Sequence, residues 1–249
     1  MEENFVKRYS QMENNGFPMD MQLSFSYDIG HSKEIEYHYS IIKDVWFKKK
    51  PKIINIENWF DAHYEAGLDY IIQQTEKEIS IEEKVYACYL AASVLSSLHY
   101  KSYAGDYGEY NKIISEKLVS LIEIDNAELR RKIIIALGWV GSINEIDLPL
   151  KLMLHNDDSL CRAWASTALM QMSFHKVSKE AIQEKSTGTF IEALSNEQDY
   201  YACGCMVYTI QTLFSKHWIS QTAVEDVEKE KIDKAKKSAV RFLKKVSAS

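Results

Sequence analysis

The stretch DNAELRRKIIIALGWV, residues 125–140, is matched by DDSLCRAWASTALMQM, residues 157–172. In each stretch an arginine stands five residues after the first aspartate, and an alanine stands six residues after that arginine. The offset is 32 residues at all three positions, which pair 125 with 157, 130 with 162 and 136 with 168. A constant offset predicts an internal repeat, in which each copy is one supersecondary unit packed on the next.

The residues that recur have physical roles in a helical repeat. An aspartate at a turn can cap the helix that follows. An arginine one turn into that helix can bond turn carbonyls or the neighbouring aspartate, and a small alanine lets adjacent helices approach closely. We therefore assign Asp125, Arg130, Asp157 and Arg162 to the framework between repeats, not to a functional site.

The composition favours helices along the rest of the chain. Among 249 residues there are only 9 Gly and 3 Pro, which are too few for the turns of a β-sandwich or a doubly wound sheet. Hydrophobic residues make up 46% of the chain and charged residues 27%, so that a core can form and disorder is excluded. The sequence predicts an all-α protein.

Helical periodicity begins near residue 57. Phe60, Tyr64, Leu68 and Ile71 recur at helical spacing. A serine at residue 80 and a glutamate at residue 83 make a capping box, so a helix is expected from there to about residue 101. Further helices are expected over 109–123, 126–140, 143–154, 158–173, 186–195, 197–215 and 222–246.

Residues 20–45 allow two interpretations. Apolar residues at 21, 23, 25 and 27 alternate as in a strand, and those at 35, 37, 39 and 41 would supply a hairpin partner. Alternatively, Ile35, Tyr39, Ile42 and Trp46 lie on one face of a helix. We prefer the helix because the segments that follow are helical.

The repeat resembles the HEAT family, in the short form whose second helix reads Asp-x-x-x-Val-Arg-x-x-Ala-x-x-Ala-Leu-Gly. Leu129-Arg130 and Cys161-Arg162 occupy the Val-Arg positions, and the likeness covers residues 109–173. It implies a right-handed α-α superhelix of about four helix pairs, with 1–56 as an irregular or helical N-terminal cap and 57–249 as the repeat domain. A 32-residue offset is shorter than the ~40–47 residues of these repeats, so a generic solenoid of helical pairs is the alternative.

The C-terminal helix combines an apolar face with most of the basic charge. Ile232, Ala235, Ala239, Leu243 and Val246 are expected to close the core. Residues 229–249 hold eight basic and two acidic side chains, a local charge of +6, so residues 1–228 carry −12 of the total of −6. This charge opposes nucleic acid and anionic membranes, and it favours a partner protein with a basic surface.

The remaining sequence signals indicate the cellular compartment of the protein. The four cysteines, at 88, 161, 203 and 205, lie in apolar helical patterns without metal-ligand spacing, and we expect them reduced and buried. The N-terminal residues do not resemble a secretory leader, and the apolar stretch over 85–98 is shorter than the ~20 residues of a membrane span. We expect a cytoplasmic protein that does not bind membranes.

No catalytic pattern emerges from the sequence. The seven histidines are scattered, without a pair at i, i+4 on one helix, and there is no Gly-x-Ser-x-Gly, P-loop or Gly-x-Gly-x-x-Gly. We expect no metal, no cofactor and no enzymatic activity. The alternatives are a nucleic-acid-binding or base-excision protein, which the acidic charge disfavours, and an enzyme similar to the bilin lyases, whose HEAT-like repeats resemble these.

Aromatic residues supply the candidate binding site. On helix 126–140 a second stripe holds Lys132 and Trp139, beside a core face of residues 129, 133, 136, 137 and 140, and Trp164 has the corresponding place on helix 158–173. The candidate partner-binding residues are Lys132, Trp139, Trp164, Tyr200, Tyr201 and, in the Tyr-rich loop 100–110, Tyr103 and Tyr107.

The resemblance implies a role for these residues. In HEAT-like solenoids the second helices line the concave side, so the two tryptophans would face a groove; the alternative is that they fill space between repeats. The predicted function is non-catalytic protein binding. The chain looks most like the helical-repeat immunity proteins that neutralise bacterial toxins by occluding a basic surface.

Overall fold

The computed structural model describes residues 2–101 and 106–248, without the side chains of the first two residues in this range, and this described part is helical, with no strand. The prediction of an all-α chain is confirmed, and the hairpin interpretation of residues 20–45 is wrong, because two helices occupy that segment. The first helices are α1 (Glu2–Asn14), α2 (Met19–Gly30), α3 (Ile35–Trp46), the 3-10 helix η1 (Asn58–His63), α4 (Tyr64–Thr75), α5 (Ile81–His99) and α6 (Gly108–Leu121). The remaining helices are α7 (Ala127–Val140), η2 (Ile143–Glu145), α8 (Asp147–His155), α9 (Ser159–His175), α10 (Lys179–Asn196), α11 (Tyr200–Leu213), α12 (Gln221–Glu225) and α13 (Lys229–Val246).

The chain divides into two compact units, residues 1–110 and residues 111–249. From the sequence we expect a boundary between residues 56 and 57, which separates an N-terminal cap from the repeats. The two compact units are defined by contacts instead, so this boundary stays a prediction. Within the described residues, none of the helices is both long and apolar enough to span a bilayer.

The first unit is built around η1. Helices α2, α3, α4 and α5 all contact this short helix, and Phe60 at its centre is fully buried. The helical run expected through Phe60, Tyr64 and Leu68 is interrupted, because Tyr64 has φ +50° where η1 ends and α4 begins. Phe60 and Leu68 are buried as expected, whereas the Tyr64 side chain is exposed. A residue in the left-handed region changes the direction of the chain, so the two helices do not share one apolar face.

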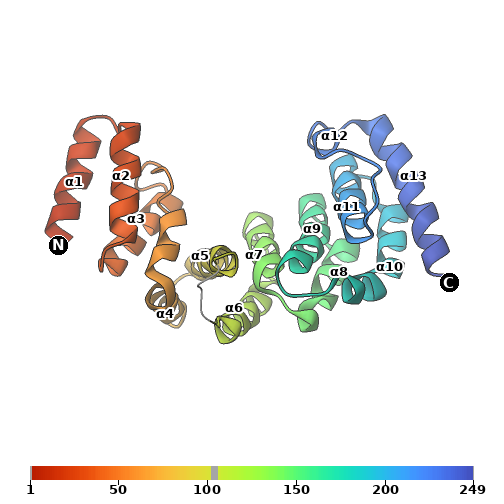
Figure 1. The fold of residues 1–249 in the computed structure, drawn as a ribbon, viewed down its shortest axis with the longest axis horizontal. Coiled ribbons are helices and arrows are strands. Elements are labelled where there is room, and N and C mark those ends of the chain that lie inside the picture. Colours follow the sequence, from red (N-terminus) through yellow and green to blue (C-terminus); the bar gives the residue numbers. More distant parts are fainter. Residues whose placement is uncertain (1, 102–105, 249) are drawn as a thin grey trace. The chain divides into compact units, whose positions relative to one another are not determined.

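The second unit has one row of helices packed against another. Helix α9 lies between α7 and α11, and α11 in turn packs on α13 (Figure 1). Helix α8 packs on α9, and α10 contacts α8, α11 and α13. The repeated alanines are buried, and a Cβ placed on Gly138 of α7 would lie 3.0 Å from the Cα of Ala168 on α9. Small residues therefore permit the close approach of α7 and α9, as the sequence indicates.

Helix ends follow the predicted signals in part. The capping box of Ser80 and Glu83 begins α5 as expected. Helix α10 begins at residue 179, capped by Ser178, earlier than the expected 186. The single helix expected over 222–246 is wrong: Val227, at φ +52°, lies between α12 and α13. Val246 is exposed and does not close the core, whereas the other four residues expected to do so are buried.

Candidate binding surface

Helix α7 presents two faces. All five residues of its expected core face are buried, at positions 129, 133, 136, 137 and 140. Lys132, Ile135 and Trp139 are half-buried and recur at spacings of three and four residues. They form a stripe along the side of α7 that no neighbouring helix fully covers.

Helix α9 carries a matching stripe. Trp164, Thr167 and Gln171 are half-buried, and two large apolar side chains extend the stripe at its ends: Leu160, 37% exposed, and Phe174, 44% exposed. Helix α9 is flanked by α7 and α11 and packs on α8, and these five residues lie together on a side of α9 that those helices leave partly uncovered. Leu160 and Phe174 are not among the residues expected from the sequence, although their distances of four and ten residues from Trp164 place them on the same helical face.

Helix α11 continues the surface with Tyr201. Tyr201, Cys205, Tyr208 and Thr212 are half-buried at spacings of four and three residues. Burial is the main cause that raises the pKa of Tyr201 to about 12, and the neighbouring Cys205 thiol adds to it. The ring of Tyr201 therefore lies partly within the protein and keeps its hydroxyl proton at neutral pH. Tyr208, not singled out from the sequence, belongs to the same stripe.

Tyr200 does not belong to this stripe. The ammonium of Lys229, at the start of α13, lies 5.3 Å from the centre of the Tyr200 ring, within the range of a cation–π contact. Adjacent residues on a helix point about 100° apart, so Tyr200 is directed to the α13 side while Tyr201 joins the stripe.

The two tryptophans lie at different levels along the row. Helices α7 and α9 run parallel, because the Cys161 thiol lies 3.6 Å from the Ala127 carbonyl and Gly138 faces Ala168. Trp164 is therefore level with the first half of α7, and Trp139 with the second half of α9, about 10 Å apart along the helix axes. They are two separate aromatic side chains on the same face of the row.

The Tyr-rich loop gives less to a binding surface. Tyr103 lies outside the described residues. Tyr107 belongs to the first unit, is buried, and has its ring 6.0 Å from the ring of Tyr110. The hydroxyl of Tyr110 donates a hydrogen bond of 2.8 Å to Asp69. Tyr107 therefore offers little exposed ring for a partner.

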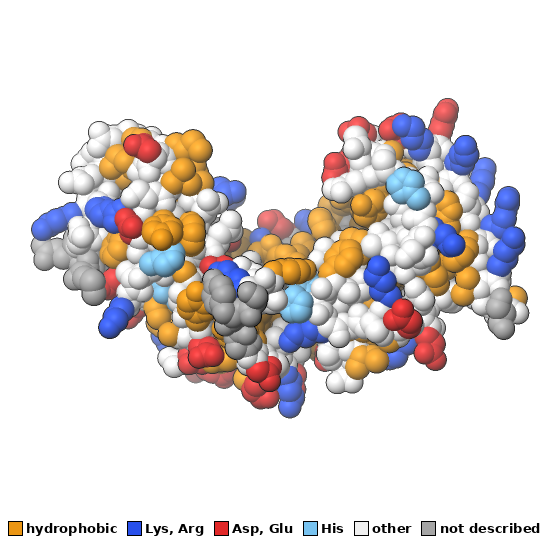
Figure 2. Space-filling model, in the orientation of Figure 1, with side chains coloured by type: hydrophobic (Ala, Val, Ile, Leu, Met, Phe, Trp, Pro, Cys, Tyr) orange, Lys and Arg blue, Asp and Glu red, His pale blue; other side chains and the backbone are white. Residues whose placement is uncertain are grey.

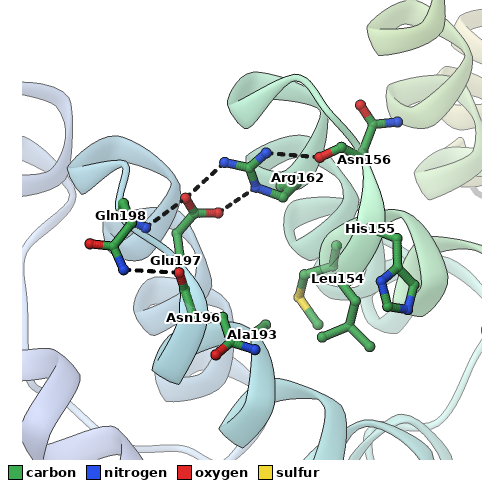
Figure 3. Close-up of a pocket in the computed structure, with 9 residues that line it drawn as sticks. Leu154, His155, Asn156, Arg162, Ala193, Asn196, Glu197 and Gln198 are labelled. Atoms are coloured by element: carbon green, nitrogen blue, oxygen red, sulfur yellow. Dashed lines mark hydrogen bonds and ion pairs between the residues drawn. The ribbon is translucent and has the colours of Figure 1, made fainter.

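A polar cleft of about 210 Å³ opens between the α8–α9 and α10–α11 turns (Figure 3). Arg162 fills one wall, and its guanidinium donates two hydrogen bonds, of 2.5 and 2.8 Å, to the carboxylate of Glu197. It donates a third, of 2.8 Å, to the Asn156 carbonyl. Glu197 is 3% exposed, and its carboxylate also accepts the backbone N–H groups of Gln198 and Asp199.

Glu197 is ionised in this environment. Burial by itself raises the pKa of the carboxyl, but hydrogen bonds from Arg162 and from backbone N–H groups outweigh it and lower the pKa. Both carboxylate oxygens of Glu197 and all three guanidinium nitrogens of Arg162 take part in hydrogen bonds within the protein. Arg162 thus holds two turns together, as the framework assignment predicts.

The preceding repeat has the equivalent contact. Arg130 donates a hydrogen bond of 3.1 Å to Asp157 at the next turn. The helix caps differ from expectation by one residue, because Asn126 and Asp158, and not Asp125 and Asp157, accept the first backbone N–H groups of α7 and α9. The caps keep the 32-residue offset, so the repeat itself is unchanged.

Comparisons with known proteins add no further assignment: no family model, no curated protein and no solved structure matches the chain. Within the part of the chain that the structure describes, no three His, Cys, Asp or Glu side chains are grouped so as to hold a metal ion.

Proposed function

We propose that the second unit is a right-handed HEAT-like solenoid of helix pairs. Three features support the proposal: the 32-residue repeat, the row of α7, α9 and α11 packed against α8 and α10, and the arginine contacts between successive turns. In such a solenoid each unit contacts its neighbours and the row of second helices provides an extended surface.

We propose that this surface binds another protein and that the chain is not an enzyme. The observation that carries the proposal is the continuation of one half-buried stripe across three adjacent helices. Its main side chains are Ile135, Trp139, Trp164, Phe174 and Tyr201, with Lys132 beside them. Trp and Tyr are enriched among the residues that dominate binding energies, and an apolar centre with a polar margin is the usual anatomy of an interface.

The charge supports a basic partner. Residues 111–228, which include the three helices of the stripe, hold 11 basic and 16 acidic side chains, a charge of −5. An acidic surface speeds the approach of a basic protein. The most specific role consistent with these features is that of an immunity-type protein, which occludes the basic surface of a toxin.

We place this encounter in the cytoplasm, which the cysteines support. All four are free thiols; Cys88, Cys161 and Cys203 are buried as expected, whereas Cys205 is half-buried. Burial raises the pKa of Cys161 to about 11, so the thiol is unreactive at neutral pH. Unreactive buried thiols are typical of proteins in a reducing compartment.

The first experiment identifies the partner through the proposed surface. A photo-reactive benzophenone amino acid replaces Phe174 on the stripe or, as the control, Val119 on α6, which is 38% exposed. After irradiation in cells of the source organism, we expect a discrete covalent adduct from position 174 that position 119 does not give. The same adducts from both positions, or none from position 174, would contradict the proposal.

The second experiment measures the energy of the contact with the purified partner. Trp164→Ala is expected to weaken binding by at least ~2 kcal/mol if Trp164 is an anchor. Circular dichroism and thermal melting of the variant separate a lost contact from unfolding, because Trp164 is half-buried. A folded variant that binds like the parent excludes Trp164 as an anchor.

A further inference from the structure

Helix α13 carries the largest concentration of positive charge in the protein. Its apolar residues Ile232, Ala235, Ala239 and Leu243 are buried, so its basic side chains are directed outward. Figure 2 shows basic side chains gathered along α13. This is the opposite charge to that of residues 111–228, which carry −5.

A groove of about 550 Å³ runs between α10 and α13 on this basic side. Its rim is formed by Lys236, Lys237, Arg241 and Lys244, together with Asp233 at one end. Val240 of α13, which is half-buried, supplies its accessible apolar lining, whereas Leu194 of α10 is fully buried behind it. The groove therefore combines cations with one accessible apolar side chain.

Three of the four cations are available to a ligand. Lys237, Arg241 and Lys244 are exposed, and none has a hydrogen-bond or ion-pair partner among the residues that the structure describes. Lys236 differs, because its ammonium donates a hydrogen bond of 3.1 Å to the Glu197 carbonyl. Lys236 thus fastens α13 to the α10–α11 turn, whereas the other three are directed to solvent.

We propose that this groove binds a short acidic peptide segment of a partner protein, with carboxylates on the rim and one apolar side chain against Val240. From Lys236 to Lys244 the rim extends about 12 Å, which matches about four residues of extended chain. Arginine and lysine recognise carboxylates through charge-assisted hydrogen bonds. The site is distinct from the aromatic stripe on α7, α9 and α11 and does not depend on the function proposed for it.

Nucleic acid fits the groove less well than a peptide. Proteins that bind single strands stack bases on aromatic rings, and the residues lining this groove include none. A polyanion longer than the rim would also extend over surfaces that carry net negative charge. A short acidic segment uses the local charge without that repulsion, and an apolar side chain within it can also contact the half-buried Val240.

The test uses the full chain and a fluorescein-labelled acidic probe peptide of about eight residues, with glutamates around two central leucines. Fluorescence anisotropy at low salt measures its binding to the parent and to two double variants. The double variant Lys237→Glu with Arg241→Glu reverses the charge of two exposed cations on the rim. Lys231→Glu with Lys245→Glu is the matched control, since it changes the net charge equally on exposed positions of α13 outside the groove.

We expect the peptide to bind the parent, the rim variant to lose at least tenfold in affinity, and the control variant to lose less than threefold. A peptide whose leucines are replaced by serines should bind several-fold more weakly. Three outcomes overturn the proposal: no binding to the parent, equal losses in the two double variants, and tighter binding of a dT oligonucleotide of comparable charge with the same dependence on the rim.

Discussion

Stability of the first unit should fall as the pH is lowered from 7 to 5, because two histidines are buried together in its core. His38 on α3 and His63 at the end of η1 are 0% and 7% exposed. Nδ1 of His38 lies 2.9 Å from Nε2 of His63, and Nε2 of His38 lies 2.7 Å from the Ile56 carbonyl oxygen. Because that oxygen only accepts, His38 donates through Nε2 and, when neutral, accepts through Nδ1 from His63.

Burial is the main cause that lowers the pKa of both rings. It lowers the pKa of His38 to about 3 and that of His63 to about 4, against the hydrogen bond to the Ile56 carbonyl at His38 and the nearby Asp61 carboxylate at His63, which act in the other direction. In the unfolded chain both rings have a pKa of about 6.5. Between these values the unfolded state binds more protons than the folded state, so the free energy of unfolding decreases as the pH falls.

The size of the stability change follows from the interval between the folded and unfolded pKa values of the two histidines. The neutral histidine pair contributes fully to the free energy of unfolding above pH 6.5. This contribution is lost progressively as the pH falls toward the pKa values that the two rings have in the folded protein. Between pH 7 and pH 5 each ring contributes a loss of about 2 kcal/mol, and the pair a loss of about 4 kcal/mol. That is a large share of the stability of an ordinary domain, which is roughly 5–15 kcal/mol.

Urea unfolding of the full chain at pH 7, 6 and 5 measures the effect, with a fluorescence probe in each unit because the two units need not unfold together. The double variant His38→Gln with His63→Gln is the control, since amides retain hydrogen-bonding groups and do not titrate; its stability should change much less over the same range. Stability of the parent that is constant or rises as the pH falls refutes the argument, because the folded pair would then hold a proton.

Three further predictions concern the free energy of unfolding, measured in the same urea experiments. Ala168→Leu should cost about 1–3 kcal/mol, because Ala168 is packed on Gly138 without room for a larger side chain; an unchanged midpoint would contradict the close contact. Arg162→Met should cost about 3–5 kcal/mol because it leaves the Glu197 carboxylate buried without its cation, and a loss below 1 kcal/mol would show that the ladder is not structural. Ser80→Ala should cost about 0.5–2 kcal/mol through loss of the α5 cap, whereas Ser80→Asn should be close to neutral.

The sequence predicts those helices whose buried positions are apolar. Helix α7 is predicted at both ends because its core residues are aliphatic. Helix α10 is predicted only from residue 186, because its buried face includes the polar Ser186 and Thr187 and so shows no continuous apolar stripe. The breaks at Tyr64 and Val227 are also missed, since neither position carries the glycine that normally indicates a residue of positive φ.

Prediction of the candidate surface from the sequence is limited in the same way, at the level of single residues. Helical spacing correctly separates Trp139 from the core face of α7, because both stripes lie on one helix. It does not tell which of Tyr200 and Tyr201 belongs to the binding stripe, since that depends on where α13 packs. The offset of a few residues between neighbouring helices is likewise set by tertiary contacts, so the level of Trp164 relative to Trp139 follows only from the structure.

The opposite charges within the second unit provide a way to distinguish its two proposed surfaces. A basic partner at the aromatic stripe is attracted by residues 111–228 and repelled by α13, whereas an acidic segment at the α10–α13 groove is attracted by α13. Salt weakens both associations, since charges are screened over about 10 Å at 0.1 M, so salt dependence alone does not separate them. Charge reversal at Lys237 and Arg241 does separate them. It should weaken binding of the acidic probe and leave the basic partner bound as tightly as before or more tightly. Loss of both ligands in that variant, with folding intact, would mean that one surface serves both.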